Sequence, residues 1–417
     1  MPALIVAIPL FDNKMTVKAY KMCDHNTDIA LDIRDDFRGR SQIYYRPGLE
    51  TIQKVGLEPF SGELPLFVDI NRFHILTGMF INKNIPADKL ILTIQGSILI
   101  DDKLLKGLFT LKELGYCIAL EGYPASGGLA NPVIKYIDHI ILDYRDKKFR
   151  EHFREVKAKL TDTQIIIFNI PDMDIYRDYS TNKNALFTGG FYTHPITDTG
   201  EELSPLKVNA LELLRQINAE DFELSNIAKT VERDPSMSIS LLRFINSPAV
   251  GLRSKVNSIS NAVALLGQKE ISRWATIAIS VGIFKDKPSE ITKLSLIRAK
   301  FAENLATIFE MGIFKNSLFM TGLFSLLDLI LKKPMDEAVN EIAVDNLVKE
   351  ALVGKSGSLY PVLDFMYAYE RADWNKVTII LIQNNIAAEE VGQAYIDAVV
   401  WYHNLLDSID KADELTV

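Results

Sequence analysis

The sequence predicts an α/β barrel over residues 1–199, followed by an all-α domain over residues 200–417. Three observations lead to this division. The chain of 417 residues can form two or three hydrophobic cores, and its 48% hydrophobic and 24% charged residues are typical of a folded globular protein. Short apolar runs recur regularly in the first half. After Pro195 these runs nearly disappear, and helical patterns follow one another.

Six apolar runs of the first half begin about 21 to 26 residues apart, the period of a strand followed by a crossover helix. Their nearly continuous hydrophobicity is typical of parallel strands that are covered on both faces. The runs are LPLFVDI (64–70), LILTIQ (90–95), YCIALE (116–121), HIILDY (139–144), QIIIFNI (164–170) and ALFTGG (185–190).

Two further strands, ALIVAIPL and TVKAYKM, precede these six, and helices such as LLKGLFTLKELG (104–115), ending at Gly115, separate them. The pattern favours a closed barrel, and an open doubly wound sheet is the alternative.

The second half predicts consecutive helices. Asp234 and Pro235 form an N-cap followed by a proline at the first helical position, and SISNAVALLG (258–267) reads as a short helix between a capping serine and a terminal glycine. The polar segment TDTGEELSP (197–205) lies between the two patterns, so we place the domain boundary at about residue 200.

Composition excludes several classes of function. With 54 acidic against 46 basic residues, the chain lacks the cationic excess that coats nucleic acid. Cys23 and Cys117 are too few for a cysteine-rich metal site, and no histidine lies between His194 and His403. No signal peptide is expected, because the apolar start MPALIVAIPLFDNK has no basic n-region and no small-residue cleavage site. The most apolar long stretch, 317–331, is too short for a membrane span and is interrupted by Asp328, so it predicts a buried helix. We therefore expect a cytoplasmic protein with no membrane or nucleic-acid partner.

In a barrel, functional side chains come from the carboxyl ends of the strands. Three carboxylates at these ends could gather around one Mg²⁺ or Ca²⁺, and the alternative is that they cap helices or face water. The polar residues at the predicted strand ends are Asp69, Thr93, Gln95, Glu121, Asp143, Asn169 and Thr188.

The second half also carries a family resemblance. The segment DPSMSISLLRFINSPAVGLRSKVNSISNAVALLGQKEISRW resembles the hallmark of HDOD domains, helical bacterial signalling modules similar to HD-type phosphohydrolases without their metal-binding residues. FMTGLFSLLDLIL and VKEALVGKSGSLYPVLDFMYAYERADW resemble the continuation found where this module follows an EAL domain. The resemblance covers roughly residues 200–405. Ser325 and Leu326 stand where an HD enzyme carries its His–Asp pair.

The first half resembles a diverged EAL domain, a barrel that in active members hydrolyses cyclic di-GMP to its linear dinucleotide. IPLFDNKMTVKAYKMC is similar to the opening of such domains, and FTGGFYTHP to their closing loop. The resemblance implies that metal ligands have changed. Lys21 replaces the signature glutamate and Asp69 replaces an asparagine, while Thr93 and Phe168 stand where glutamates are expected.

The remaining EAL positions are also altered. The resemblance implies that Glu121 and Gly122 replace paired aspartates, and that Ile141 replaces the lysine that contacts the attacking water. Asp143 matches the family, whereas Thr188 stands in place of a glutamine.

Each lost carboxylate weakens a divalent-metal site, and Lys21 brings positive charge to it. We therefore expect a degenerate phosphodiesterase domain that is not an enzyme and has no cofactor or metal, with the Lys21 amino group paired to Glu121 or Asp69 instead.

The predicted function is a non-catalytic bacterial signal-transduction or scaffold protein that acts through protein–protein interaction. One alternative is a receptor for cyclic di-GMP or a related nucleotide without hydrolysis, with Arg40, Arg46 and the Gly189–Gly190 loop as phosphate contacts. Residual phosphodiesterase activity is the other. Any binding of cyclic di-GMP is expected to be weak.

The HDOD domain is expected to bind an unknown signalling protein. The segment MYAYERADW places three aromatic residues, Tyr367, Tyr369 and Trp374, beside charged residues, a composition that is enriched at interfaces. Packing in the core or between domains is the alternative for each of them.

Overall fold

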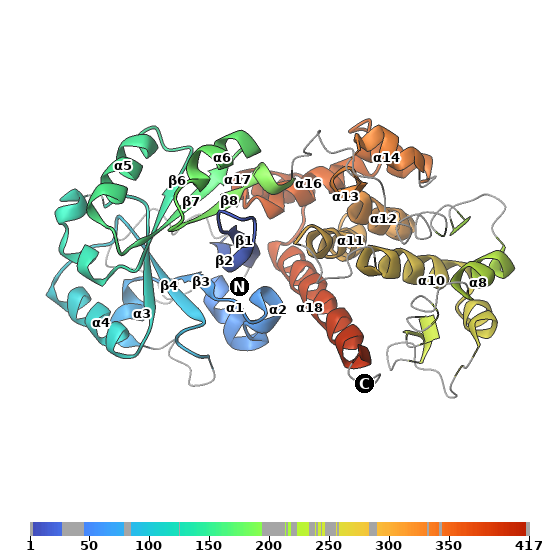
Figure 1. The fold of residues 1–417 in the computed structure, drawn as a ribbon, viewed down its shortest axis with the longest axis horizontal. Helices are drawn as coiled ribbons and strands as arrows, with labels where there is room; N and C mark the ends of the chain where they lie inside the picture. The colour runs from blue at the N-terminus through green and yellow to red at the C-terminus, as the bar shows by residue number, and fades with distance from the viewer. Residues whose placement is uncertain are drawn as a thin grey trace. The chain divides into compact units, whose positions relative to one another are not determined.

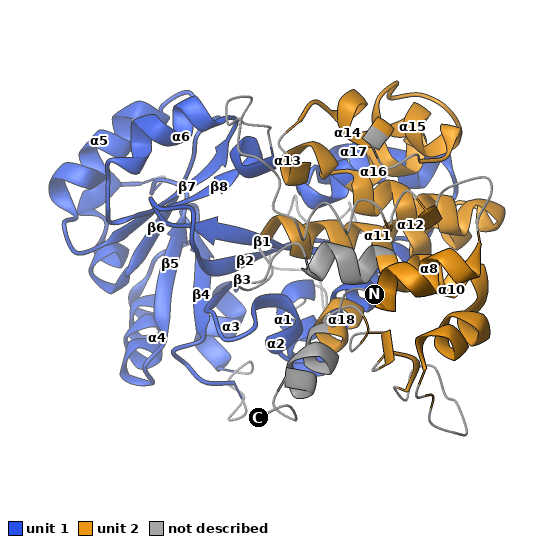
Figure 2. Ribbon diagram, turned by 45° about the vertical axis from the view of Figure 1, so that its right-hand side comes forward, with its two compact units in different colours: residues 1–194, 367–400 blue, residues 195–366, 401–417 orange. Residues whose placement is uncertain are grey.

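The protein is described by a computed structural model that divides into two compact units (Figure 2). The first comprises residues 1–194 and 367–400, and the second residues 195–366 and 401–417. The structure describes residues 3–26, 46–78, 85–124, 126–193, 213, 216–217, 223–232, 238, 241–242, 244–246, 256, 258–282, 290–331, 333–341 and 344–413.

A closed barrel of eight strands forms the first unit, and the strands follow one another around it in chain order (Figure 1). This confirms the predicted barrel over the open sheet. The strands are β1 (Ala3–Phe11), β2 (Val17–Asn26), β3 (Leu66–Asp69), β4 (Leu90–Gln95), β5 (Cys117–Glu121), β6 (His139–Asp143), β7 (Gln164–Ile170) and β8 (Ala185–Gly189).

The first strand runs antiparallel to both of its neighbours, whereas the pairs from β2 to β8 are parallel. A tight turn makes this possible, because the Asp12 carboxylate accepts hydrogen bonds from the backbone N–H groups of Lys14 and Thr16. β1 pairs with β2 along its length but with β8 only at Phe11. The outer edge of β1 therefore needs other partners for its backbone.

Helices follow the strands on the outside of the barrel (Figure 1). Asn71, Asp101 and Asp172 cap three of them by accepting backbone N–H bonds. Gly115 follows α4 with φ 87°, as predicted for a helix-ending glycine. The helices are α1 (Pro47–Val55), α2 (Glu58–Ser61), α3 (Arg72–Thr77), α4 (Asp102–Glu113), η1 (Gly128–Ala130), η2 (Pro132–Tyr136), α5 (Phe149–Lys159), α6 (Met173–Ser180) and η3 (Gly190–Thr193).

Two apolar layers hold the barrel together, because successive side chains of a strand point to opposite faces. In β7, Ile166 and Phe168 belong to the cluster inside the barrel. Ile165 and Ile167 belong to the cluster that the strands form with the helices.

Two tyrosines from the C-terminal helices bind the outer edge of β1. The Tyr369 hydroxyl, in α16 (Tyr360–Glu370), donates to Ile5 O at 2.8 Å and accepts from Ile5 N at 3.2 Å. Tyr395, in α18 (Ala388–Asp413), accepts from Ala7 N at 3.2 Å.

The structure thus divides the chain differently from the predicted domains 1–199 and 200–417. The units part after His194, near the predicted boundary, but residues 367–400, with α17 (Trp374–Gln383), join the barrel. The polar segment 197–205 lies outside the described residues.

The second unit is helical where it is described. Ser258 Oγ accepts from Asn261 N at 3.1 Å, and Gly267, at φ 67°, interrupts the helix, so the start and end predicted for 258–267 are confirmed. Asp234 and Pro235 lie outside the described residues. The helices are α8 (Leu224–Glu232), α10 (Ile259–Gly282), α11 (Glu290–Ile308), η4 (Gly312–Phe314), α12 (Lys315–Phe324), α13 (Leu327–Leu331), α14 (Met335–Glu341), α15 (Asn346–Leu352) and the first part of α16.

The apolar stretch 317–331 forms most of α12 followed by α13, and it is mostly buried. Within the described part of the chain, no helix combines the length and apolarity that a membrane crossing requires.

Candidate functional site

The carboxyl end of the barrel, which we call the mouth, contains a buried lysine. Lys21 lies two residues after Ala19, a member of the inner cluster, so its side chain points into the barrel. Its Nζ is 2.6 Å from Asp69 Oδ1 and 3.1 Å from Glu121 Oε2, and only 2% of the residue is exposed. The predicted pairing of Lys21 with Asp69 or Glu121 is therefore confirmed with both.

The two carboxylates keep Lys21 charged. Burial alone would lower the pKa of the Lys21 ammonium, but the negative charges of Asp69 and Glu121 outweigh it and raise that pKa. Gln95 Nε2 donates to Glu121 Oε2 at 3.2 Å and helps to fix this carboxylate. Cys23 is the next inward position of β2, and burial raises the pKa of its thiol to about 12. The thiol is thus protonated at neutral pH.

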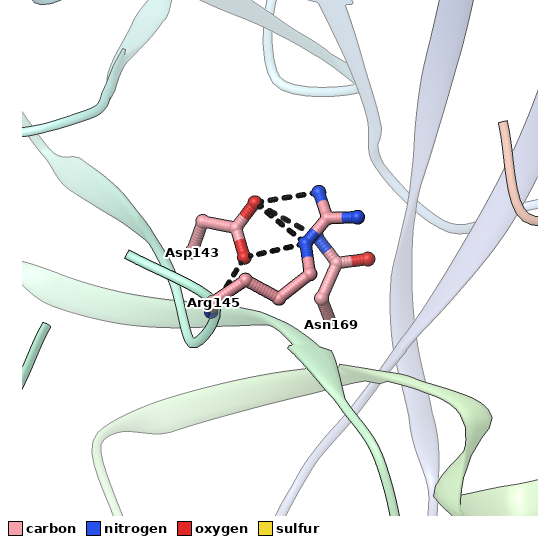
Figure 3. A network of polar contacts seen from close by, with 3 residues as sticks. All are labelled: Asp143, Arg145 and Asn169. Carbon is pink, nitrogen blue, oxygen red and sulfur yellow. Dashed lines mark hydrogen bonds and ion pairs between the residues drawn. The ribbon is translucent and has the colours of Figure 1, made fainter. Parts of the chain in front are cut away.

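A second polar network lies at the ends of β6 and β7 (Figure 3). Arg145 binds the Asp143 carboxylate through Nε, at 3.1 and 3.2 Å, and through Nη2 at 2.7 Å, while Asn169 Nδ2 donates to Asp143 Oδ2 at 2.9 Å. Burial would raise the pKa of Asp143, but these hydrogen bonds lower it overall. The carboxylate is therefore ionised at neutral pH.

An irregularity in β7 directs Asn169 toward Asp143. The register between β7 and β8 shifts between Ile167 and Ile170, and Asn169 has φ 60°, a left-handed conformation that asparagine tolerates. At the far side of the shift the two strands approach so closely that a Cβ on Gly189 would lie 2.2 Å from Ile170 O. Only glycine fits there.

The other EAL-type positions are apolar or lack a bound partner. Ile141 and Phe168 belong to the inner cluster, and Gly122, at φ 83°, donates its N–H to Ile141 O. Thr93 and Thr188 are buried, and their Oγ atoms have no hydrogen-bond partner among the described residues. These five positions therefore offer no carboxylate.

The residues of the mouth do not fit a divalent cation. The Lys21 ammonium lies between Asp69 and Glu121, where such an ion would need to sit, and Asp143 is bound by Arg145. In the described ranges, no three His, Cys, Asp or Glu side chains converge closely enough to hold a metal. Asp69, Glu121 and Asp143 each pair with a cationic side chain, and Glu121 and Asp143 also stay partly exposed to water.

The proposed phosphate contacts of the nucleotide-receptor alternative are only partly described. Arg46 precedes α1 and lies near Asp24, whose Oδ2 accepts from Gly48 N at 2.9 Å. Burial raises the pKa of Asp24, and the Arg46 charge opposes this rise. Arg40 lies outside the described residues. In the Gly189–Gly190 loop, Gly189 serves the approach of β8 to β7.

The guessed partner contacts need a correction at Tyr369. This residue is fully buried and bound to Ile5, so its ring is not available to another protein. Trp374 is half-buried and stacks on His25 with 6.0 Å between ring centroids, and Tyr367 is half-buried. The segment packs within the barrel unit, which the sequence could not show.

The positions that correspond to an HD pair are packing residues. Ser325 Oγ donates to Gly322 O at 2.6 Å and accepts from Arg298 Nη1 at 3.0 Å, and Leu326 is 2% exposed.

Comparisons with known proteins agree with the two-part architecture. Residues 203–351 match the HDOD domain family, so the helical half carries an HDOD domain as predicted. The chain is 27% identical to the uncharacterized protein YuxH of Bacillus subtilis over 427 residues, 98% of this chain and 100% of that protein. It is 24% identical to the cyclic di-GMP phosphodiesterase CdgJ of Vibrio cholerae over 373 residues, 89% of this chain and 86% of that protein.

Among solved structures, an EAL domain protein from Listeria monocytogenes is similar with 15% identity and a TM-score of 0.32, covering 46% of this chain and 87% of that one.

The comparison with CdgJ corrects one prediction. We expected the chain not to be an enzyme, but a protein that aligns with 89% of it is named a cyclic di-GMP phosphodiesterase. The prediction failed because it counted lost ligands one position at a time. Acidic side chains remain at the mouth in Asp69, Glu121 and Asp143.

The sequence reasoning also missed Arg145. Its spacing of two residues after Asp143, at the end of an apolar run, was the available signal.

Proposed function

We propose that this protein acts in cyclic di-GMP signalling. In this proposal the mouth of the barrel binds the dinucleotide, and the HDOD domain contacts a protein partner. Similarity to CdgJ over most of both chains supports the pathway, because that relative is named for the same dinucleotide.

The observation that carries the binding site is the arrangement of Arg145. Its guanidinium is held on Asp143 through Nε and Nη2, while its side chain is 71% exposed. Nη1 makes no hydrogen bond to the described residues (Figure 3), so it remains available as a donor to an anion. Guanidinium groups match phosphate oxygens in geometry and remain charged at every physiological pH.

A titration tests the binding proposal. Full-length protein is titrated calorimetrically with cyclic di-GMP, with and without Mg²⁺, and GMP serves as the ligand control. The variant R145A removes one charged hydrogen-bond donor, so its dissociation constant should rise at least about tenfold. The matched control R150A changes an exposed arginine on α5 and should leave the constant unchanged. Absence of binding to the unmodified protein, or equal affinity of R145A, would reject the site.

Hydrolysis of cyclic di-GMP is the second candidate function, and the name of CdgJ favours it. The protein is incubated with cyclic di-GMP in Mg²⁺ or Mn²⁺, and the linear dinucleotide is measured by chromatography. Product above the enzyme-free control that disappears in E121Q would support this function. A yield equal to the control in both metals would count against it.

The role of the HDOD domain in partner binding rests on the family match and on buried Ser325 and Leu326 at the positions of an HD pair. Crosslinking in cells followed by mass spectrometry tests it. Residues of this chain that are crosslinked to another protein should lie within 203–351. Crosslinks confined to the barrel would contradict this role.

A further inference from the structure

We infer that the Lys21 ammonium is a built-in replacement for a divalent cation, so that the mouth takes up Mn²⁺ only when this charge is removed by substitution of Lys21, and most tightly when an acidic residue takes its place. This inference concerns the metal alone and does not depend on whether cyclic di-GMP binds.

The first argument is the position of Nζ. Asp69 at the end of β3 and Glu121 at the end of β5 both direct an oxygen at this one atom, at 2.6 and 3.1 Å. Two carboxylates that converge on one point are the start of a site for an oxygen-preferring cation. The amino group occupies that point.

The second argument is that the ammonium cannot easily leave. Lys21 is 2% exposed, and its side chain comes from β2, which pairs with β3 at Tyr20–Leu66 and Lys21–Phe67. Moving Nζ out of the way would leave two carboxylates close together and a charge in the apolar interior formed by residues such as Phe67. A metal ion entering without that movement would meet a like charge at contact distance.

The third argument is charge balance. Lysine with two carboxylates carries the same formal charge as a divalent cation with three. A glutamate at position 21 would start from the same backbone and point toward the same Asp69 and Glu121 oxygens. The variant K21E therefore supplies a third carboxylate and removes the competing cation in a single change.

The test uses full-length protein and Mn²⁺ alone, with free Mn²⁺ measured by electron paramagnetic resonance. The unmodified protein and the D69N variant should bind Mn²⁺ equally, because the mouth of the unmodified protein holds none. K21E should bind one Mn²⁺ per chain at least about 100-fold more tightly than the unmodified protein. The double variant K21E/D69N should bind it at least tenfold more weakly than K21E. The matched control K18E changes an exposed lysine of the same strand and should gain nothing.

Two results would overturn the inference. One is a Mn²⁺ site in the unmodified protein that D69N weakens. The other is a folded K21E protein, judged by circular dichroism, whose Mn²⁺ affinity equals that of the unmodified chain.

Folding of K21E is itself informative. If K21E folds only when Mn²⁺ is present, the metal has taken the place of the ammonium. If it folds in neither condition, K21M decides: a thermal midpoint that Mn²⁺ raises in K21M but not in the unmodified protein supports the inference, and an unchanged midpoint rejects it.

Discussion

The Tyr369 hydroxyl should contribute strongly to the stability of the barrel. It serves both the N–H and the C=O of Ile5, on a strand edge that β8 does not cover at this point. The variant Y369F keeps the ring and removes only the oxygen. Each buried backbone group left without a partner costs about 1–3 kcal/mol, and because one hydroxyl serves both groups we expect a loss of about 3 kcal/mol.

Thermal unfolding of full-length protein, followed by circular dichroism, measures this loss. For a unit of about 150–250 residues, each kcal/mol shifts the midpoint by about 2–4 °C, so Y369F should melt about 6–12 °C lower. Y395F removes one bond to Ala7 and should shift it less. Y136F is the control, because the half-buried Tyr136 hydroxyl has no hydrogen bond to the described residues. A shift in Y369F no larger than in Y136F would refute the reasoning.

Two further predictions concern the mouth. K21M should lower the free energy of unfolding by about 2 kcal/mol, less than the 3–5 kcal/mol typical of a broken buried pair because its two carboxylate partners reach water. Folding raises the pKa of Lys21 above 10.5, so the stabilisation by its charge is complete below that pH and declines above it. In urea unfolding, the difference in free energy of unfolding between the unmodified protein and K21M should therefore narrow above about pH 10.5. A difference that stays constant with pH would contradict this. G189A should lower the free energy of unfolding by about 3 kcal/mol or more, because its Cβ would lie 2.2 Å from Ile170 O. The control G312A has open space around its Cβ and should leave the stability unchanged. Equal urea midpoints for the two variants would contradict the tight β7–β8 contact.

Most of the strands were predictable because they are nearly continuous apolar runs, which reflects burial on both faces, whereas β2 (VKAYKMCDHN) mixes apolar and polar residues. The antiparallel direction of β1 was not, since ALIVAIPL has the same composition as a parallel strand. The bond between Tyr369 and Ile5 joins residues 364 positions apart, and no local pattern announces it. For the same reason, the sequence of MYAYERADW suggested an exposed aromatic cluster, although Tyr369 is buried.

The candidate site was predictable to different degrees. The pairing of Lys21 with Asp69 or Glu121 was predicted from the EAL resemblance, which placed all three residues at one metal site, together with their opposite charges. The network of Asp143, Arg145 and Asn169 depends on a register shift in β7, and such a shift leaves no mark in a hydrophobic pattern.

The C-terminal helices belong to the framework of the mouth. Lys21 is carried by β2, and β2 pairs along its length with β1, including Ile8 opposite Lys21. The outer edge of β1 is in turn held at Ile5 and Ala7 by tyrosines from residues 367–400. A barrel cut at residue 199 would expose this edge, and a free strand edge pairs readily with other chains. Function measured on such a fragment would therefore report on a barrel whose lysine-bearing hairpin has lost its support.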